Sequence, residues 1–217
     1  FAMPESGIGL FPDVGGSYFL PRLAGELGLY LGLTGARLKA ADAVYTGITP
    51  VYIESAKIDE LKGALSGHRF GNDAHSEVSS ILARFASDPG AAPIAEVVGA
   101  IDTHFANPSA EAILASLEGD PDPWAQKTAE TLREKSPTSV KLAFQQLRRG
   151  AKLDFDDCMR MEFRMVGRVI QGVDFYEGTR AVVIDKDQSP KWNPATLEEV
   201  SDAEIEAYFA PLPDGEL

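Results

Sequence analysis

The sequence has few of the residues that build covalent or metal-bound sites. It contains one cysteine, Cys158, and three histidines in 217 residues. A single cysteine excludes an internal disulfide and a thiolate metal cluster, and the amphipathic stretch around it favours a buried, unreactive thiol. The histidines, His68, His75 and His104, show no ligand spacing, so we predict no metal site.

Positive charge and long apolar runs are also scarce. Lysine and arginine number 20 against 33 aspartates and glutamates, which gives a formal net charge of −13. Such a surface repels nucleic-acid phosphates and anionic membranes, and no stretch approaches the roughly 18 to 20 apolar residues of a membrane span. We therefore expect neither nucleic acid nor membrane as a partner, and a polyanionic ligand would need a local basic patch.

The sequence does not open on a methionine, and we recognise no targeting segment in its residues. It opens on Phe-Ala-Met-Pro-Glu, residues 1–5. This opening is typical of a buried strand that runs into a turn, because the residue before a proline is extended. Domains rarely begin inside a strand, so we expect this chain to be the second part of a longer one.

Helical patterns dominate what is present. We predict helices over 18–33 (closed by Gly35), 40–45 (ending at Gly47) and 57–65, four more between 73 and 133, and further ones beginning near Ser136, Phe155, Asp174 and Ser201. Asp174 with Glu177, and Ser201 with Glu204, have the spacing of a capping box. Residues 49–53, Thr-Pro-Val-Tyr-Ile, are predicted as a short strand.

The segment most suited to chemistry is a glycine-rich loop that follows Pro4. It carries two carboxylates, Glu5 and Asp13, among apolar residues and glycines. Burial in such surroundings raises a carboxyl pKa toward the working pH, as a general acid or base requires. Gly15 and Gly16 open a helix whose free amide N–H groups would suit an anionic ligand. Both carboxylates also have a structural interpretation: Glu5 as a solvated turn residue, and Asp13 as the N-cap of that helix.

Three blocks of sequence carry a family resemblance. Residues 4–16 contain Pro-Glu and then Ile-Gly-Leu-Phe-Pro-Asp-Val-Gly-Gly, residues 136–141 read Ser-Pro-Thr-Ser-Val-Lys, and residues 174–192 run from Asp-Phe-Tyr-Glu-Gly-Thr-Arg-Ala to Ser-Pro-Lys-Trp. These blocks resemble the crotonase superfamily of acyl-CoA enzymes, and within it the 3-hydroxyisobutyryl-CoA hydrolases. Asp13 stands where ordinary enoyl-CoA hydratases tend to carry a small residue. The resemblance covers nearly the whole chain and is weakest from residue 57 to 133.

The resemblance implies a fold and a reaction. The fold is the crotonase-like α/β spiral, of which this chain is the later, mostly helical part: residues 1–66 continue the core and include the active-site loop, and residues 67–217 form a helical C-terminal region. The implied reaction is hydrolysis of a short 3-hydroxyacyl-CoA thioester, 3-hydroxyisobutyryl-CoA, as in valine catabolism. No cofactor is implied beyond the coenzyme A of the substrate. The alternatives are an enoyl-CoA hydratase or isomerase, and a non-catalytic helical interaction scaffold.

Roles for single residues follow from the same resemblance. Glu5 is the main acid–base or nucleophilic carboxylate, and Asp13 binds the substrate's 3-hydroxyl or assists protonation of the leaving thiolate. Gly9 and Phe11 join them in substrate binding.

Two further implications concern coenzyme A and partners. Lys186 and Lys191 are candidates for contacts with the CoA phosphates, with solvated surface lysines as the alternative interpretation. Two backbone N–H groups that hold the thioester oxygen, and the adenine-binding loop, belong to an N-terminal half outside this sequence. We therefore expect that half as a partner and no activity without it. We also expect a homo-oligomer, located in the bacterial cytoplasm or, in a eukaryote, in the mitochondrial matrix.

Overall fold

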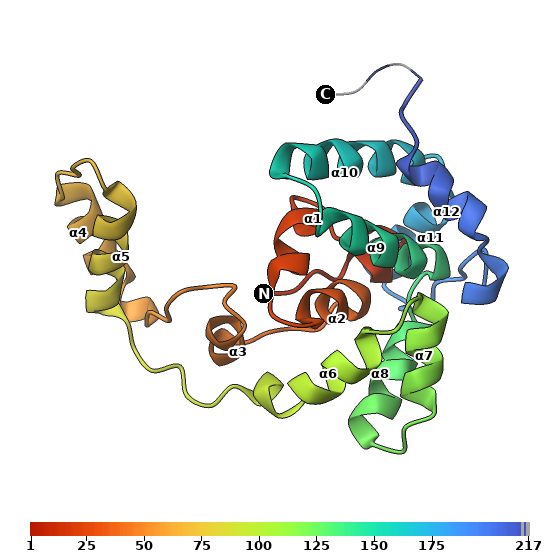
Figure 1. The fold of residues 1–217 in the computed structure, drawn as a ribbon, viewed down its shortest axis with the longest axis horizontal. Coiled ribbons are helices and arrows are strands. Elements are labelled where there is room, and N and C mark those ends of the chain that lie inside the picture. Colours follow the sequence, from red (N-terminus) through yellow and green to blue (C-terminus); the bar gives the residue numbers. More distant parts are fainter. Residues whose placement is uncertain (214, 216–217) are drawn as a thin grey trace. The chain divides into compact units, whose positions relative to one another are not determined.

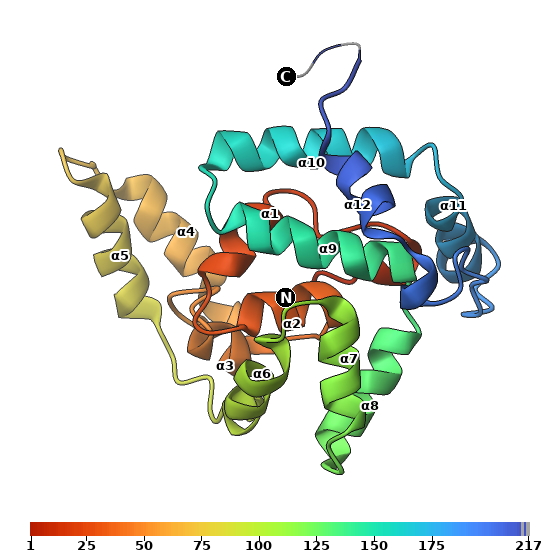
Figure 2. The same cartoon turned by 45° about the vertical axis from the view of Figure 1, so that its right-hand side comes forward.

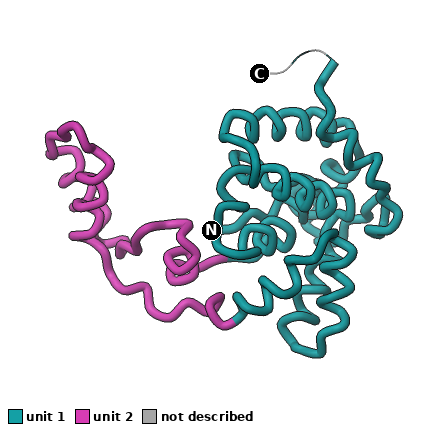
Figure 3. The backbone as a smooth tube through the Cα atoms, in the orientation of Figure 1, with its two compact units in different colours: residues 1–37, 97–217 teal, residues 38–96 magenta. Residues whose placement is uncertain are grey.

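The structure is a computed structural model that describes residues 1–213 and 215. Two compact units make up the chain, one formed by residues 1–37 and 97–217 and the other by residues 38–96 (Figure 3). Within the described residues, no helix is both long enough and apolar enough to cross a membrane.

The larger unit begins with short helical turns that carry the glycine-rich loop. These are η1 (Glu5–Ile8), α1 (Gly16–Phe19), η2 (Leu20–Arg22) and α2 (Leu27–Thr34). α2 ends at Gly35, whose φ of 69° is left-handed and therefore suits glycine. The predicted helix over 18–33 is thus three short pieces rather than one, broken around Pro21 and Gly25.

The rest of the larger unit is a set of packed helices. They are α6 (Val98–Phe105), α7 (Ala110–Glu118), α8 (Pro123–Arg133), α9 (Pro137–Gly150), α10 (Phe155–Val169), α11 (Asp174–Thr179), the π-helical turn η5 (Arg180–Ile184), η6 (Leu197–Glu199) and α12 (Asp202–Phe209). α9 is central: it contacts α1, α2, α7 and α12, and both views show it between α10 and α2 (Figures 1 and 2).

A hydrophobic core lies beneath the glycine-rich loop. Phe11 from that loop is completely buried against side chains of α9, α10 and the α12 region. The buried members of this cluster are Phe11, Leu142, Met161, Met165, Val169, Val200, Ile205 and Phe209. Burial of large apolar side chains contributes roughly 1.5–3 kcal/mol each, so this cluster fixes the loop onto the helices.

The smaller unit contains α3 (Ala40–Tyr45), η3 (Ser55–Lys57), α4 (Ile58–Gly67), α5 (Ala74–Phe85) and η4 (Pro93–Glu96). α4 pairs with α5 through a small cluster of Leu61, Ile81 and Phe85. α3 packs near η4, where the Asp42 carboxylate accepts a hydrogen bond from the backbone N–H of Ile94 at 3.0 Å.

Most of the predicted helices are present, and two further local predictions in this part of the fold are wrong. Residues 49–53 form no strand: Tyr52 makes only an isolated antiparallel bridge to Ser87, because no neighbouring strand extends the ladder. Asp174 does not cap α11, whose N-cap position is Val173 without a side-chain bond. The carboxylate of Asp174 is used in tertiary contacts instead. By contrast, Ser201 caps α12 in the predicted capping box.

The predicted division of the enzyme at residue 66 does not coincide with either boundary between the compact units, and it falls within α4. It concerned the core and helical parts of a whole crotonase-type enzyme, and for that enzyme it stays a prediction. The expected strand at residues 1–4 is not formed in this structure.

Candidate active site

Glu5 begins η1, and its position is fixed by two hydrogen bonds of the next residue, Ser6. The hydroxyl of Ser6 donates to the carbonyl of Leu33 at 3.1 Å, and the carbonyl of Ser6 accepts from the N–H of Ser136 at 3.1 Å. The Glu5 side chain is half-buried, and its Oε2 is enclosed by protein without a hydrogen-bond partner. This excludes the interpretation of Glu5 as a solvated turn residue.

The surroundings of Glu5 perturb its acidity. Burial raises the pKa of its carboxyl above the ordinary value; its own backbone amide opposes that shift, and the charge of Asp13 adds to it. Asp13 therefore lies near enough for its charge to act on Glu5. A carboxyl with a raised pKa and an unpartnered buried oxygen has the properties of a general base awaiting a substrate, although its catalytic role stays a prediction.

The half-buried Asp13 precedes α1 but does not cap it. The N-cap position is Gly15, with φ of 91° and no side-chain cap. The amides at the start of α1 are taken by Glu162 instead: its Oε2 accepts from the N–H of Gly15 and its Oε1 from the N–H of Ser17, both at 3.0 Å. The capping interpretation of Asp13 is therefore wrong, which leaves its side chain available to the site.

The expected anion site at the Gly15–Gly16 helix start is also absent. The amides of Gly15 and Ser17 point to Glu162, and the N–H of Gly16 donates to the carbonyl of Asp13 at 2.8 Å. All three donors are satisfied within the chain, so none is free for a ligand or a developing oxyanion.

Sequence reasoning missed Glu162, although the sequence holds a signal for it. On α10 the residue lies one turn from Cys158 and from Met165, on the stripe of buried side chains. A glutamate on the apolar face of an amphipathic helix is rarely buried without partners. The position of Glu162 on the apolar face therefore indicates that its carboxylate binds a distant part of the chain. The pattern does not indicate which amides it binds.

Gly9 and Phe11, predicted to bind substrate, lie deep in the structure. Gly9 has φ of 74°, and a Cβ placed there would lie 2.3 Å from the backbone of Asp174. Phe11 is 0% exposed and belongs to the core. Both positions shape and support the loop from below, and direct contact with substrate stays a prediction for them.

Lys186 and Lys191, the candidates for CoA phosphates, lie on the exposed segment that follows η5. The segment is held by Arg180, which pairs with Glu177 at 2.9 Å and with Asp185 at 2.8 Å. The backbone N–H of Lys191 donates to Glu177 at 2.8 Å. Both lysines thus extend from a braced segment, and the hydrogen bond that Lys191 makes to Glu177 comes from its backbone and not from its side chain.

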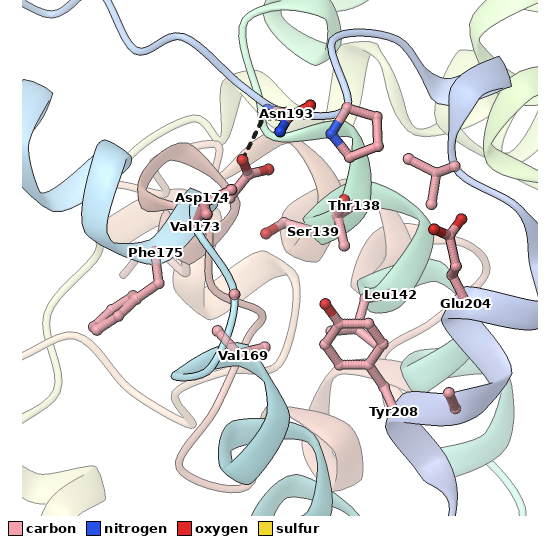
Figure 4. Close-up of a pocket in the computed structure, with 15 residues that line it drawn as sticks. Thr138, Ser139, Leu142, Val169, Val173, Asp174, Phe175, Asn193, Glu204 and Tyr208 are labelled. Carbon is pink, nitrogen blue, oxygen red and sulfur yellow. Dashed lines mark hydrogen bonds between the residues drawn. The ribbon is translucent and has the colours of Figure 1, made fainter.

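A cavity of ≈ 380 Å³ lies below the loop and is lined by Gly9 but not by Glu5 or Asp13. Figure 4 shows Asp174 and Phe175 on one side of it and Glu204 and Tyr208 on the other. The two oxygens of Asp174 accept from the Ser136 hydroxyl at 2.6 Å and the Asn193 N–H at 2.9 Å. This carboxylate is therefore fully engaged in holding α9, α11 and the C-terminal segment together.

Known proteins resemble this chain over nearly its whole length. A family model described as "Enoyl-CoA hydratase/isomerase" matches residues 1–209. Among curated proteins, the chain is 44% identical to the mitochondrial 3-hydroxyisobutyryl-CoA hydrolase of Xenopus tropicalis, an alignment that covers 100% of this chain and 57% of the relative. The chain thus spans little more than half the length of this relative.

Two solved structures are similar in fold. A carnitinyl-CoA dehydratase from Mycobacterium thermoresistibile superposes with a TM-score of 0.86 at 38% identity, and an enoyl-CoA hydratase from Rhodobacter sphaeroides with a TM-score of 0.81 at 33% identity. Each match covers 99% of this chain and 60% of the other. They confirm the predicted fold class, in which these residues are the later, mostly helical part.

Proposed function

Because the chain belongs to the enoyl-CoA hydratase/isomerase family, we propose that it is part of an enzyme that hydrolyses a short 3-hydroxyacyl-CoA thioester, 3-hydroxyisobutyryl-CoA, to the free acid and coenzyme A. The observation that carries the proposal is the half-buried carboxyl of Glu5, with one enclosed oxygen unpartnered and its pKa raised by burial. The similarity to a 3-hydroxyisobutyryl-CoA hydrolase supports this choice of substrate, and with it a place in valine catabolism.

In this proposal Glu5 acts as a general base. Its carboxylate takes a proton from water while the water oxygen attacks the thioester carbonyl carbon. The C–S bond then breaks, and the CoA thiolate takes up a proton. Attack by the Glu5 carboxylate itself, with a later hydrolysis of the acyl-enzyme, uses the same residue. Asp13 binds the substrate's 3-hydroxyl or delivers the proton to the leaving thiolate.

The donors for the thioester oxygen lie outside these residues in our proposal. The amides at the start of α1 are all engaged, so this helix does not supply an oxyanion hole. The whole enzyme therefore needs a further part of the polypeptide as a partner. Coenzyme A enters as part of the substrate, with its phosphates near Lys186 and Lys191, and we propose no separate cofactor. A homo-oligomer in the bacterial cytoplasm or the mitochondrial matrix completes the proposal.

A hydratase is the second candidate, favoured by the names of the two similar solved structures. A substrate panel separates the candidates. The full-length protein is given 3-hydroxyisobutyryl-CoA with a thiol reagent, and separately crotonyl-CoA with detection of enoyl absorbance. We expect free thiol from the first and little change in the second. Loss of enoyl absorbance without thiol release would establish the hydratase, and turnover of neither would favour a non-catalytic scaffold.

A further inference from the structure

The segment that carries Asp13 is held by two buried polar side chains that come from distant helices. Glu162 on α10 is only 4% exposed, and its two oxygens accept from the N–H groups of Gly15 and Ser17 at 3.0 Å. Charge-assisted bonds of this kind are about twice as strong as neutral ones. The carboxylate thus fixes the backbone that immediately follows Asp13.

Gln146 on α9 holds the same segment from its other side. This glutamine is 0% exposed, and its Nε2 donates to the carbonyl of Pro12 at 2.6 Å and to the hydroxyl of Ser17 at 2.7 Å. Pro12 directly precedes Asp13. Bonds from two helices therefore enclose the carboxylate-bearing residue on both sides along the chain.

The backbone between these bonds is strained. Val14 has φ of 48° although it is β-branched, and its side chain is 75% exposed. A β-branched residue at positive φ is a genuine outlier, and such a conformation persists only where its surroundings over-determine it. Because Val14 buries little of itself, the strained turn is held by the backbone bond from Gly16 to Asp13 and by the bonds to Glu162 and Gln146.

We propose that Glu162 is a positioning residue for the reaction. By capping α1 in place of Asp13, it releases the Asp13 side chain from a structural role and holds the strained turn that presents it beside Glu5. Gln146 assists from α9. This inference rests on the proposed roles of Glu5 and Asp13, and it adds a residue that never contacts the substrate.

A double-mutant cycle in the full-length enzyme tests the proposal. We expect Glu162→Gln to lower kcat by about 10- to 100-fold, the size of effect that a misplaced catalytic group produces. In an Asp13→Asn background the same change should cost less than about threefold, because residues that act through one another are non-additive. An equal loss in both backgrounds would overturn the proposal, as would an unchanged kcat.

The matched control is Asp102→Asn. The Asp102 carboxylate accepts from the N–H of Glu26 at 2.8 Å and is thus a similar bond elsewhere in the unit. We expect it to lower thermal stability without lowering kcat. If its kcat falls as far as that of Glu162→Gln, general destabilisation explains both variants and the proposal fails.

A second variant and a second reaction separate the failure of this proposal from misfolding and from failure of the proposed hydrolysis. Should Glu162→Gln fail to fold, Gln146→Met, which keeps the volume but removes both donated bonds, takes its place in the cycle with the same expected non-additivity. Absence of CoA release by the wild-type enzyme overturns the proposed hydrolysis alone. The cycle is then measured on enoyl-CoA hydration, where additivity with Asp13 would still contradict the role of Glu162.

Discussion

Glu5→Gln should stabilise the folded protein at neutral pH. Glu5 Oε2 is enclosed without a partner. A glutamine keeps a polar atom at that position but removes the buried negative charge, and burial of a charge costs more than burial of a neutral polar group. Because the side chain is only half-buried and solvent screens part of its charge, we expect a gain of about 1 kcal/mol or less. Active-site groups often lower the free energy of unfolding, because function requires an arrangement that is not the most stable one.

The pH dependence of this gain follows from the raised pKa of Glu5. The folded state binds the Glu5 proton more tightly than the unfolded state, so wild-type stability falls as pH rises from the ordinary glutamate value of about 4.3 through the folded-state pKa. The glutamine variant does not titrate there. Its advantage should therefore be near zero at the acid end of this window and complete above it.

Urea unfolding of the full-length wild type and Glu5→Gln, measured across about pH 4.5 to 8, is the appropriate assay, with midpoints compared at equal m-value. Glu60→Gln, an exposed change on α4, is the control and should leave the stability curve unchanged. Parallel curves for the wild type and Glu5→Gln at all pH values would show that folding does not perturb the Glu5 pKa, and would contradict this prediction.

Three further predictions concern the loop and the candidate CoA contacts. Gly9→Ala should destabilise the protein by about 2–4 kcal/mol in thermal or urea unfolding, since the added Cβ meets the α11 backbone at 2.3 Å; an unchanged midpoint would contradict the close approach. Asp13→Asn should move the acidic limb of the pH–rate profile to lower pH, because the Asp13 charge helps to raise the Glu5 pKa; a limb moved upward would show the opposite coupling. Replacing Lys186 and Lys191 by alanine should raise KM for the CoA thioester about two- to tenfold but leave KM for the pantetheine thioester, which lacks the nucleotide phosphates, unaltered. Equal effects on both substrates would mean that these lysines are ordinary surface residues.

Helix positions were largely predictable because their signals are local. Ser136 and Ser201 accept from amides three residues ahead, at 3.1 and 3.2 Å, as their spacing indicates. Cys158 is buried as predicted, and burial raises the pKa of its thiol. These features depend on neighbours within a few positions along the chain or on one helix face.

Tertiary use of a polar side chain was not predictable in the same way. Asp174 and Glu177 have capping-box spacing, yet Asp174 binds Ser136 from 38 positions away. Glu162 bonds amides 145 and 147 positions distant. A local pattern predicts that these carboxylates accept hydrogen bonds. Which donor each one binds depends on how distant helices pack.

The features of the candidate site divide in the same way, into those that are local to the loop and those that depend on distant helices. The influence of the Asp13 charge on Glu5 acts within a short loop, whose two carboxylates are visible in the sequence. The engagement of the amides at Gly15 and Ser17 was not predictable, because it depends on α10. The same packing excludes the capping role that the sequence allowed for Asp13.

The most direct measurement of the central claim is thiol release from 3-hydroxyisobutyryl-CoA by the full-length enzyme with and without the Glu5 carboxyl. We expect steady release by the wild type and by Glu60→Gln, and a loss of at least about 100-fold in kcat for Glu5→Gln, as follows from removal of a general base. Undiminished release by a folded Glu5→Gln enzyme would contradict that claim.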